Sequence, residues 1–138
     1  MVELINALIL EKEELLSKLL KREVSDKIFI KKVYIADSGD EAIKICNNKR
    51  VDIAIIDIDL EYNFSLNGLE IAKIIYNKNK FINFIIISSY SKYAVQSFCV
   101  HPFDYIMKPV NYKRIRKTLS EIVNMHTKSD YNKQNQIL

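Results

Sequence analysis

The chain has 138 residues, 49% of them hydrophobic and 28% charged, which is typical of one folded domain and excludes an intrinsically disordered protein. No apolar run approaches the ~20 residues that span a bilayer. The first residues lack the basic start of a secretory signal, so we expect a cytoplasmic protein with no membrane partner. The net charge of +4 is only weak evidence for nucleic-acid binding, because the lysines are scattered among acidic residues. We therefore do not expect direct binding of nucleic acid.

Five apolar segments with the character of strands alternate with five segments of helical character. The predicted strands are residues 7–10, 29–36, 53–56, 84–87 and 103–107. The segments 53–56 and 84–87 are unbroken apolar runs, which is typical of strands buried on both faces of a parallel sheet. Ser38, followed by acidic residues, predicts the capped start of a helix after the second strand.

The other four helices are predicted from apolar residues that recur at helical spacing. These residues are Leu15, Leu16, Leu19 and Leu20 in the first helix; Leu69, Ala72, Ile75 and Tyr76 in the third; Ala94, Val95 and Phe98 in the fourth; and Ile115, Leu119, Ile122 and Val123 in the fifth. Strict alternation of strands and helices requires right-handed crossovers. The sequence therefore predicts an α/β fold with a parallel sheet, helices on both faces, and a site at the carboxyl ends of the strands.

The end of the chain differs in composition from the rest. Residues 127–138 are polar until the last two positions. Such a composition is typical of a linker or a frayed end. We therefore interpret residues 1–126 as one domain, and residues 127–138 as a flexible tail or the start of a linker to a further domain.

Polar residues follow four of the five predicted strands at the point where each strand ends. They are Glu11 and Glu13 after the first strand, Asp57 and Asp59 after the third, Ser88 and Ser89 after the fourth, and Lys108 after the fifth. Carboxylate oxygens suit Mg²⁺, which can bridge a bound phosphate, while a lysine and a hydroxyl can hold the other phosphate oxygens. Phosphoryl transfer requires mainly positioning and charge neutralisation, and an aspartate can itself be the nucleophile, for which Asp57 is the natural choice.

Each of these residues, taken alone, has a plainer interpretation. Asp57 could be a turn or helix-cap residue, and Ser88 a capping hydroxyl. Lys108 could be a solvated surface lysine and Tyr105 an ordinary core residue, while residues 11–13 could form the exposed first turn of an amphipathic helix. The order and combination of the segments favour the functional interpretation for all but residues 11–13.

Three segments together resemble the receiver domain of bacterial response regulators. They are Val51-Asp52-Ile53-Ala54-Ile55-Ile56-Asp57-Ile58-Asp59-Leu60 with Asn67-Gly68-Leu69-Glu70; Ile86-Ile87-Ser88-Ser89-Tyr90; and Phe103-Asp104-Tyr105-Ile106-Met107-Lys108-Pro109. Two short stretches, residues 57–60 and 90–94, are most similar to receivers of the LytTR type, whose output domains bind DNA. The resemblance covers about residues 5–125.

The resemblance implies a fold and a set of partners. The fold would be a flavodoxin-like (βα)5 three-layer sandwich with a parallel sheet of order 2-1-3-4-5. The peptide bond between Lys108 and Pro109 would be cis. A sensor histidine kinase would be the partner, and the switched surface around the fourth helix and fifth strand would be read by another protein or by a second copy in a homodimer, to control transcription.

The resemblance also implies a role for each site residue. Asp57 would accept the phosphoryl group, with Lys108 and Ser88 on the phosphoryl oxygens. Mg²⁺ would be held by Glu11, Asp57 and the carbonyl of Asp59, and no other cofactor is implied. Ser88 and Tyr105 would form the switch pair. The domain would promote its own phosphorylation and dephosphorylation rather than act as a conventional enzyme.

Residues 10–13 depart from the family pattern, which has two adjacent aspartates and a glutamate where this chain reads Leu-Glu-Lys-Glu. In the alignment we prefer, Glu11 replaces the first aspartate and Lys12 replaces the one that binds the metal directly. Two unit charges about 4 Å apart near a protein surface have a Coulomb energy of roughly 4 kcal/mol before screening. Repulsion of this size from Lys12 could abolish Mg²⁺ affinity. Lys12 could instead pair with Asp57 and do part of the ion's work, or mimic an activated state. With the alignment shifted by one residue, Glu11 becomes the direct ligand and a weakened site survives.

A second departure is the segment between Asp57 and Gly68, which is longer than the commonest family version and lacks its proline. Loops on this side of the fold tolerate insertion, so we interpret the difference as subtype variation.

Three functions stay open from the sequence. The first is the phosphoryl-accepting switch. The second is a receiver-like interaction module that takes no phosphate, its state fixed by Lys12, with no Mg²⁺-dependent response. The third is a flavin- or nucleotide-binding protein of the same topology. The turn after the first strand has no glycine-rich phosphate loop, which argues against this third function.

Overall fold

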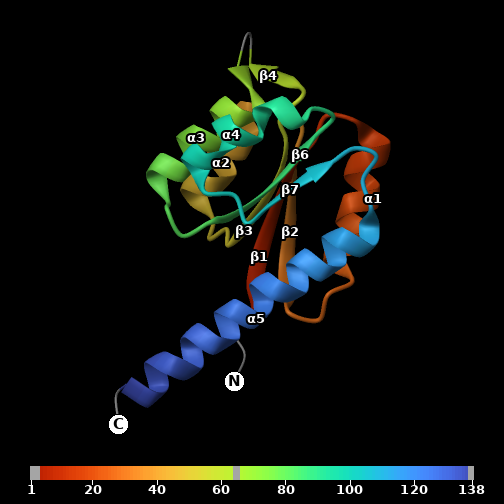
Figure 1. Cartoon of the computed structure of the whole chain (residues 1–138). Coiled ribbons are helices and arrows are strands. Elements are labelled where there is room, and N and C mark those ends of the chain that lie inside the picture. The colour runs from red at the N-terminus through yellow and green to blue at the C-terminus, as the bar shows by residue number, and fades with distance from the viewer. Residues whose placement is uncertain (1–3, 64–65, 137–138) are drawn as a thin grey trace.

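A computed structural model describes residues 4–63 and 66–136 and has a parallel sheet at its centre (Figure 1). The strands of this sheet are β1 (Ile5–Leu10), β2 (Ile30–Ala36), β3 (Ile53–Asp57), β6 (Asn83–Ser88) and β7 (Asp104–Met107). They lie in the order β2-β1-β3-β6-β7, and every neighbouring pair is parallel. Counted within this sheet alone, the order is 2-1-3-4-5, which confirms the predicted flavodoxin-like fold.

Helices cover both faces of the sheet, so the fold has three layers (Figure 1). They are α1 (Glu14–Ser25), α2 (Gly39–Asn48), α3 (Gly68–Lys78), α4 (Ala94–Ser97) and α5 (Tyr112–Gln136). One core cluster joins the sheet to α1 and α5, and a second joins it to α2 and α3. Residues 53–56 and 84–87 are fully buried, because each lies between the two helical layers.

The start of α2 follows the predicted capping pattern. The side-chain oxygen of Ser38 accepts a hydrogen bond of 3.1 Å from the backbone N–H of Glu41. Asp40 and Glu41 lie in the first turn, where negative charge is favourable beside the helix N-terminus. This confirms that Ser38 begins the helix.

The fourth helix differs from its prediction. α4 has four residues and lies between the 3₁₀ turns η1 (Ser91–Tyr93) and η2 (Phe98–Val100). Val95 and Phe98, expected on a buried apolar face, are 73% and 66% exposed. A 3₁₀ helix has 3.0 residues per turn instead of 3.6, so residues at α-helical spacing do not stay on one face when the α-helix is only four residues long. Ser97 and Val100 are buried instead. The prediction of a buried face formed by Val95 and Phe98 was wrong.

The long segment before α3 contains a small ribbon of its own. β4 (Glu61–Asn63) and β5 (Leu66–Asn67) pair in antiparallel fashion, outside the main sheet (Figure 1). The extra length between Asp57 and Gly68, interpreted from the sequence as subtype variation, is therefore used in part for an antiparallel strand pair.

The last helix is longer than the predicted domain. Its predicted apolar residues, Ile115, Leu119, Ile122 and Val123, are all buried. The helix continues past residue 126 to Gln136 and projects beyond the sheet (Figure 1), so no change of structure marks the expected boundary between residues 126 and 127. That residues 127–138 lead to a further domain stays a prediction.

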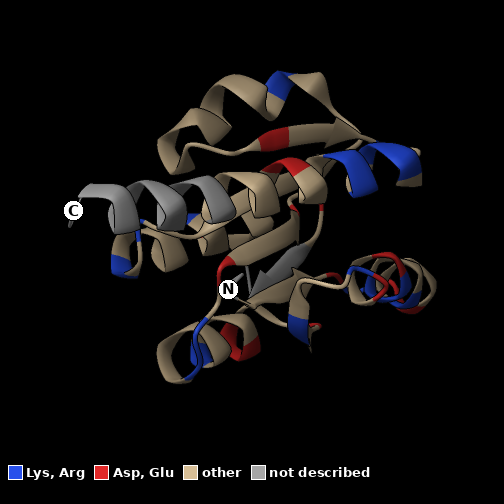
Figure 2. Ribbon diagram, turned by 90° about the horizontal axis from the view of Figure 1, so that it is seen from below, with Lys and Arg blue, Asp and Glu red and all other residues tan. Residues whose placement is uncertain are grey.

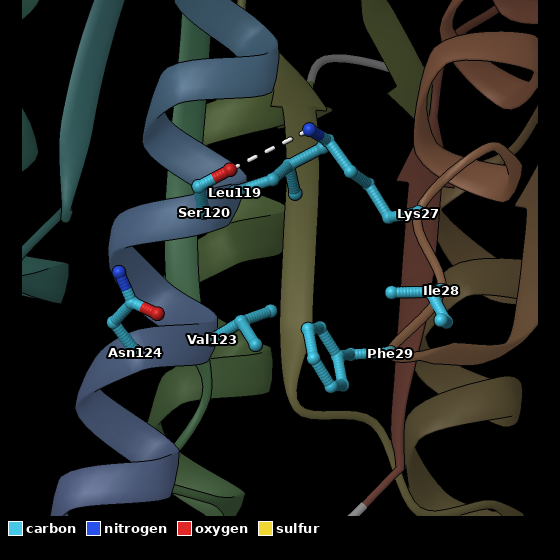
Figure 3. Close-up of a pocket in the computed structure, with 7 residues that line it drawn as sticks. All are labelled: Lys27, Ile28, Phe29, Leu119, Ser120, Val123 and Asn124. Atoms are coloured by element: carbon cyan, nitrogen blue, oxygen red, sulfur yellow. Dashed lines mark hydrogen bonds between the residues drawn. The ribbon is translucent and has the colours of Figure 1, made fainter.

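Charged residues of both signs occur on the same elements (Figure 2). On α1, for example, the exposed Lys18 forms an i,i+4 ion pair of 2.8 Å with Glu14. Among the described residues, no helix has both the length and the apolar character needed to cross a membrane.

Candidate functional site

The polar residues at the strand ends converge, as the parallel sheet predicts. Asp57 and Ser88 are the last residues of β3 and β6, Glu11 directly follows β1, and Lys108 directly follows β7. Asp59 lies two residues beyond β3 and is hydrogen-bonded to Ser88, which joins the ends of the two strands. These residues form the candidate site.

Asp57 lies at the centre of the site. Its side chain is 1% exposed, and its Oδ2 atom lies 2.6 Å from Nζ of Lys108. The other oxygen, Oδ1, accepts a hydrogen bond of 2.9 Å from the backbone N–H of Asp59. A buried carboxylate requires such partners because desolvation of an unpaired charge is costly.

Lys108 is held so that its ammonium group stays charged. Its Nζ contacts Oδ2 of Asp57 and, at 3.3 Å, Oδ2 of Asp59. Burial acts to lower the pKa of Lys108, but the hydrogen bonds and the charges of the two aspartates outweigh it and raise the pKa. The bond between Lys108 and Pro109 is cis, as predicted.

Asp59 uses its side chain more extensively than the sequence indicated. Oδ1 accepts a hydrogen bond of 2.6 Å from Oγ of Ser88, and Oδ2 accepts one of 2.7 Å from the backbone N–H of Ser89. Burial acts to raise the pKa of Asp59, but hydrogen bonds from Ser88, Ser89 and Lys108 together lower it. The sequence predicts a role only for the carbonyl of this residue.

Glu11 and its neighbour Lys12 point in different directions. Glu11 is 1% exposed, whereas Lys12 and Glu13 are exposed, and α1 begins only at Glu14. The interpretation of residues 11–13 as an exposed helical turn is therefore wrong for Glu11. Leu10, which the shifted alignment compared with the first family aspartate, is fully buried in the apolar core.

The two oxygens of the Glu11 carboxyl group have different surroundings. Oε1 accepts a hydrogen bond of 2.9 Å from the backbone N–H of Glu13, while Oε2 is buried without a hydrogen-bond partner in the part of the chain that the structure describes. Burial, with the adjacent Asp57 carboxyl as a further cause, raises the pKa of Glu11 to about 8. A buried, unpaired oxygen donor beside a carboxylate fits a hard divalent cation. Within the described residues, however, no three acidic, histidine or cysteine side chains are grouped closely enough to hold a metal.

Tyr105 and Ser88 are linked through the backbone of Tyr90. The hydroxyl of Tyr105, a partly buried residue of β7, donates to the carbonyl oxygen of Tyr90. The backbone N–H of Tyr90 in turn donates to Oγ of Ser88 at 3.0 Å. Burial raises the pKa of Tyr105, so its hydroxyl remains a donor at neutral pH. The family resemblance implies the pair of Ser88 and Tyr105, but no sequence pattern indicates their connection through Tyr90.

Gly68, at the start of α3, packs directly against the backbone of the site. The side chain of Asn67 caps the helix by accepting a hydrogen bond of 3.0 Å from the N–H of Glu70. A Cβ atom at position 68 would lie 2.2 Å from the carbonyl oxygen of Asp57. The Asn-Gly pair was noted in the sequence, but only the structure shows that it lets α3 approach Asp57.

The comparison with protein families identifies the class of this chain. The family model described as the response regulator receiver domain matches residues 7–120. The chain therefore belongs to the response regulator receiver family. This assignment decides against the flavin- or nucleotide-binding alternative of the same topology.

Similar curated proteins are response regulators. The chain is 26% identical over 128 residues to an uncharacterized response regulatory protein of Vibrio cholerae, covering 93% of this chain and 52% of the relative. It is 35% identical over 86 residues to the sensory transduction protein LytT of Bacillus cereus, covering 62% of this chain and 34% of the relative. The transcriptional regulatory protein BtsR of Escherichia coli is 25% identical over 127 residues, 92% of this chain and 52% of that protein. The chain thus spans about half the length, or less, of these relatives.

Solved structures confirm the fold. A receiver domain protein from Methanospirillum hungatei superimposes with a TM-score of 0.80 at 22% identity, covering 92% of this chain and 99% of that one. The response regulatory domain of mrkE from Klebsiella pneumoniae gives 0.79 at 25% identity, covering 90% and 99%. Receiver domains generally bind Mg²⁺ at their acidic site and interact with histidine kinases.

Proposed function

We propose that this receiver domain is a phosphoryl-accepting switch in which Asp57 is the nucleophile. The observation that carries the proposal is the buried carboxylate of Asp57, whose Oδ2 lies 2.6 Å from Nζ of Lys108. A carboxylate oxygen of Asp57 would form a bond to phosphorus while the bond from phosphorus to the kinase's histidine nitrogen breaks, and that nitrogen would keep the electron pair. The product would be an acyl phosphate on Asp57.

Lys108 and Ser88 would neutralise and orient the phosphoryl oxygens. Lys108 is charged and already adjacent to Asp57, so it supplies positive charge where the transferred group arrives. Ser88, the last residue of β6, supplies a hydroxyl from the neighbouring strand. Ser88 ends a strand and Lys108 directly follows one, so the sheet holds the backbone of both residues near Asp57.

Mg²⁺ would be held by Glu11, Asp57 and the carbonyl of Asp59. The burial of Oε2 of Glu11 beside Asp57 supports this assignment, and Mg²⁺ would have to displace the proton that the raised pKa of Glu11 retains at neutral pH. When bound, the ion would offset the negative charge that the phosphoryl group and the carboxylates share. Lys12 is exposed beside Glu11, so it adds positive charge at the rim, and we expect Mg²⁺ to bind more weakly for that reason.

The switch would be read on the surface formed by α4, η2 and β7. A phosphoryl group would draw Ser88 toward Asp57, and the link through Tyr90 would carry that change to Tyr105. Val95 and Phe98 are exposed on this surface, which supports its use by a partner or by a second copy. We propose that the protein acts in the cytoplasm, that a sensor histidine kinase is the phosphoryl donor, and that transcription is the output, as the name of the BtsR relative suggests.

A second candidate is a receiver that no longer takes phosphate. The observation that favours it is Lys12, a cation directly after the buried Glu11. In this case Asp57 and Lys108 would form a permanent ion pair, and the protein would be an interaction module of fixed state.

Intact mass spectrometry after incubation with acetyl phosphate, with and without Mg²⁺, distinguishes the two candidates. We expect a phosphoryl adduct on the native protein that is enhanced by Mg²⁺ and absent from Asp57→Asn. Native protein that forms no adduct with acetyl phosphate or with its own kinase would favour the phosphate-independent module.

A further inference from the structure

The side chain of Asp59 contacts Ser88 and Lys108, the two donors that the proposed function assigns to the phosphoryl group, and also the N–H of Ser89. Oδ1 accepts from the hydroxyl of Ser88 at 2.6 Å, and Oδ2 accepts from the N–H of Ser89 at 2.7 Å. Oδ2 also lies 3.3 Å from Nζ of Lys108. One carboxylate thus contacts the end of β6 and the residue after β7, with a side chain that is 11% exposed.

Two of these donors cannot serve a second acceptor. A serine hydroxyl has a single proton, as does a backbone N–H, whereas a lysine ammonium has three. Lys108 can therefore contact Asp57 and Asp59 together, and it does so here. Ser88 has to leave Asp59 before its hydroxyl can donate to a phosphoryl oxygen.

Charge adds to this competition. A phosphoryl group brings roughly 1.5 to 2 negative charges at neutral pH. Asp59 shares Lys108 with Asp57, the residue that would carry that group. Two anions would then compete for one cation, so the carboxylate of Asp59 becomes less favourable in this position as the phosphoryl group arrives.

We infer that the carboxylate of Asp59 is an internal occupant of the phosphoryl-oxygen donors Ser88 and Lys108 and of the adjacent Ser89 N–H, and that an incoming phosphoryl group must displace it. The inference rests on the proposed function, since that function assigns Ser88 and Lys108 to the phosphoryl oxygens. It makes Asp59 a positioning residue that opposes phosphorylation, in addition to any role of its backbone carbonyl.

The first test is titration of the protein with inorganic phosphate. Binding is measured from the change in the ¹⁵N NMR shift of the Ser89 amide during the titration. Asp59→Ala removes both the charge and the acceptor, and we expect its dissociation constant for phosphate to fall by roughly fivefold relative to native. Asp59→Asn removes the charge but keeps an acceptor for Ser88, so its effect should be smaller. The control is Asp37→Asn, which removes one exposed charge after β2 at the same edge of the sheet.

The second test is the initial rate of phosphorylation by acetyl phosphate in the same variants. We expect the rate to rise in Asp59→Ala above both native and Asp37→Asn, a gain that a merely destabilised protein would not show. Phosphate affinity in Asp59→Ala no higher than in Asp37→Asn would overturn the inference, whether or not Asp57 is phosphorylated. Failure of the proposed function would look different: phosphate would still bind Asp59→Ala more tightly, but no variant would form an adduct.

Discussion

Gly68 and Asp57 are in backbone contact, so close that a Cβ atom at position 68 would lie 2.2 Å from the carbonyl oxygen of Asp57 and 2.7 Å from Cα of Ile58. Both neighbours are backbone atoms, which cannot rotate away as a side chain would. The start of α3 and the end of β3 can therefore approach only because residue 68 has no side chain.

Gly68→Ala should destabilise the protein, although alanine is the better helix former. We expect a loss of about 2–4 kcal/mol in the free energy of unfolding, because α3 or the backbone of Asp57 must move. Urea unfolding followed by circular dichroism measures this. The control Lys73→Ala, at an exposed position on the same helix, should change stability by less than about 0.5 kcal/mol. A neutral or stabilising Gly68→Ala would contradict the close contact.

Lys108→Ala should reveal the ion pair with Asp57. Removal of the cation leaves a carboxylate that is 1% exposed without its charged partner, and we expect a cost of about 2 kcal/mol, below the full value for a buried pair because Lys108 is 23% exposed. In an Asp57→Asn background the same change should cost less than about 1 kcal/mol. Equal costs in the two backgrounds, measured by urea unfolding, would show that the pair is not coupled.

The cluster of Asp104, Arg114 and Thr118 should make stability depend on acid pH. Oδ1 of Asp104 lies 2.5 Å from Nη2 of Arg114, and Oδ2 accepts from the hydroxyl of Thr118 at 2.8 Å. Burial acts to raise the pKa of Asp104, but hydrogen bonds from Arg114 and Thr118 outweigh it and lower the pKa.

Because the pKa of Asp104 is lowered on folding, its stabilising contribution is complete above the pKa of the unfolded chain and is lost as pH falls through the folded value. Asp104→Asn should therefore reduce the melting temperature at pH 7 and have a smaller effect near pH 3. Calorimetry at the two pH values measures the difference. An effect of equal size at both would exclude a contribution from the ionised carboxylate.

Phe98 should matter for association of the phosphorylated protein. It is 66% exposed on the surface proposed for the homodimer, and Phe81, 90% exposed between α3 and β6, is a matched control. We expect Phe98→Ser to weaken dimerisation of the phosphorylated protein by about tenfold, since one buried aromatic ring contributes roughly 1–2 kcal/mol. Phe81→Ser should have no effect. Sedimentation velocity distinguishes the two, and equal behaviour of both variants would place the interface elsewhere.

The sequence by itself determined the fold and the position of the candidate site. The uninterrupted runs 53–56 and 84–87 indicated strands buried on both faces, and the alternation with helices required a parallel sheet. From that sheet it followed that Asp57, Ser88 and Lys108, each at a strand end, would lie together. These features depend on local periodicity and on chain topology, which a sequence displays directly.

Only the tertiary structure decided which groups at the site contact one another. Glu11 is buried and Lys12 exposed although they are neighbours, and the carboxylate of Asp59 contacts donors at the ends of two other strands. The exposure of Phe98 likewise depends on where a one-turn helix ends. Such contacts join residues about thirty or more positions apart, and their geometry is set by packing at the strand ends, for which no local pattern exists.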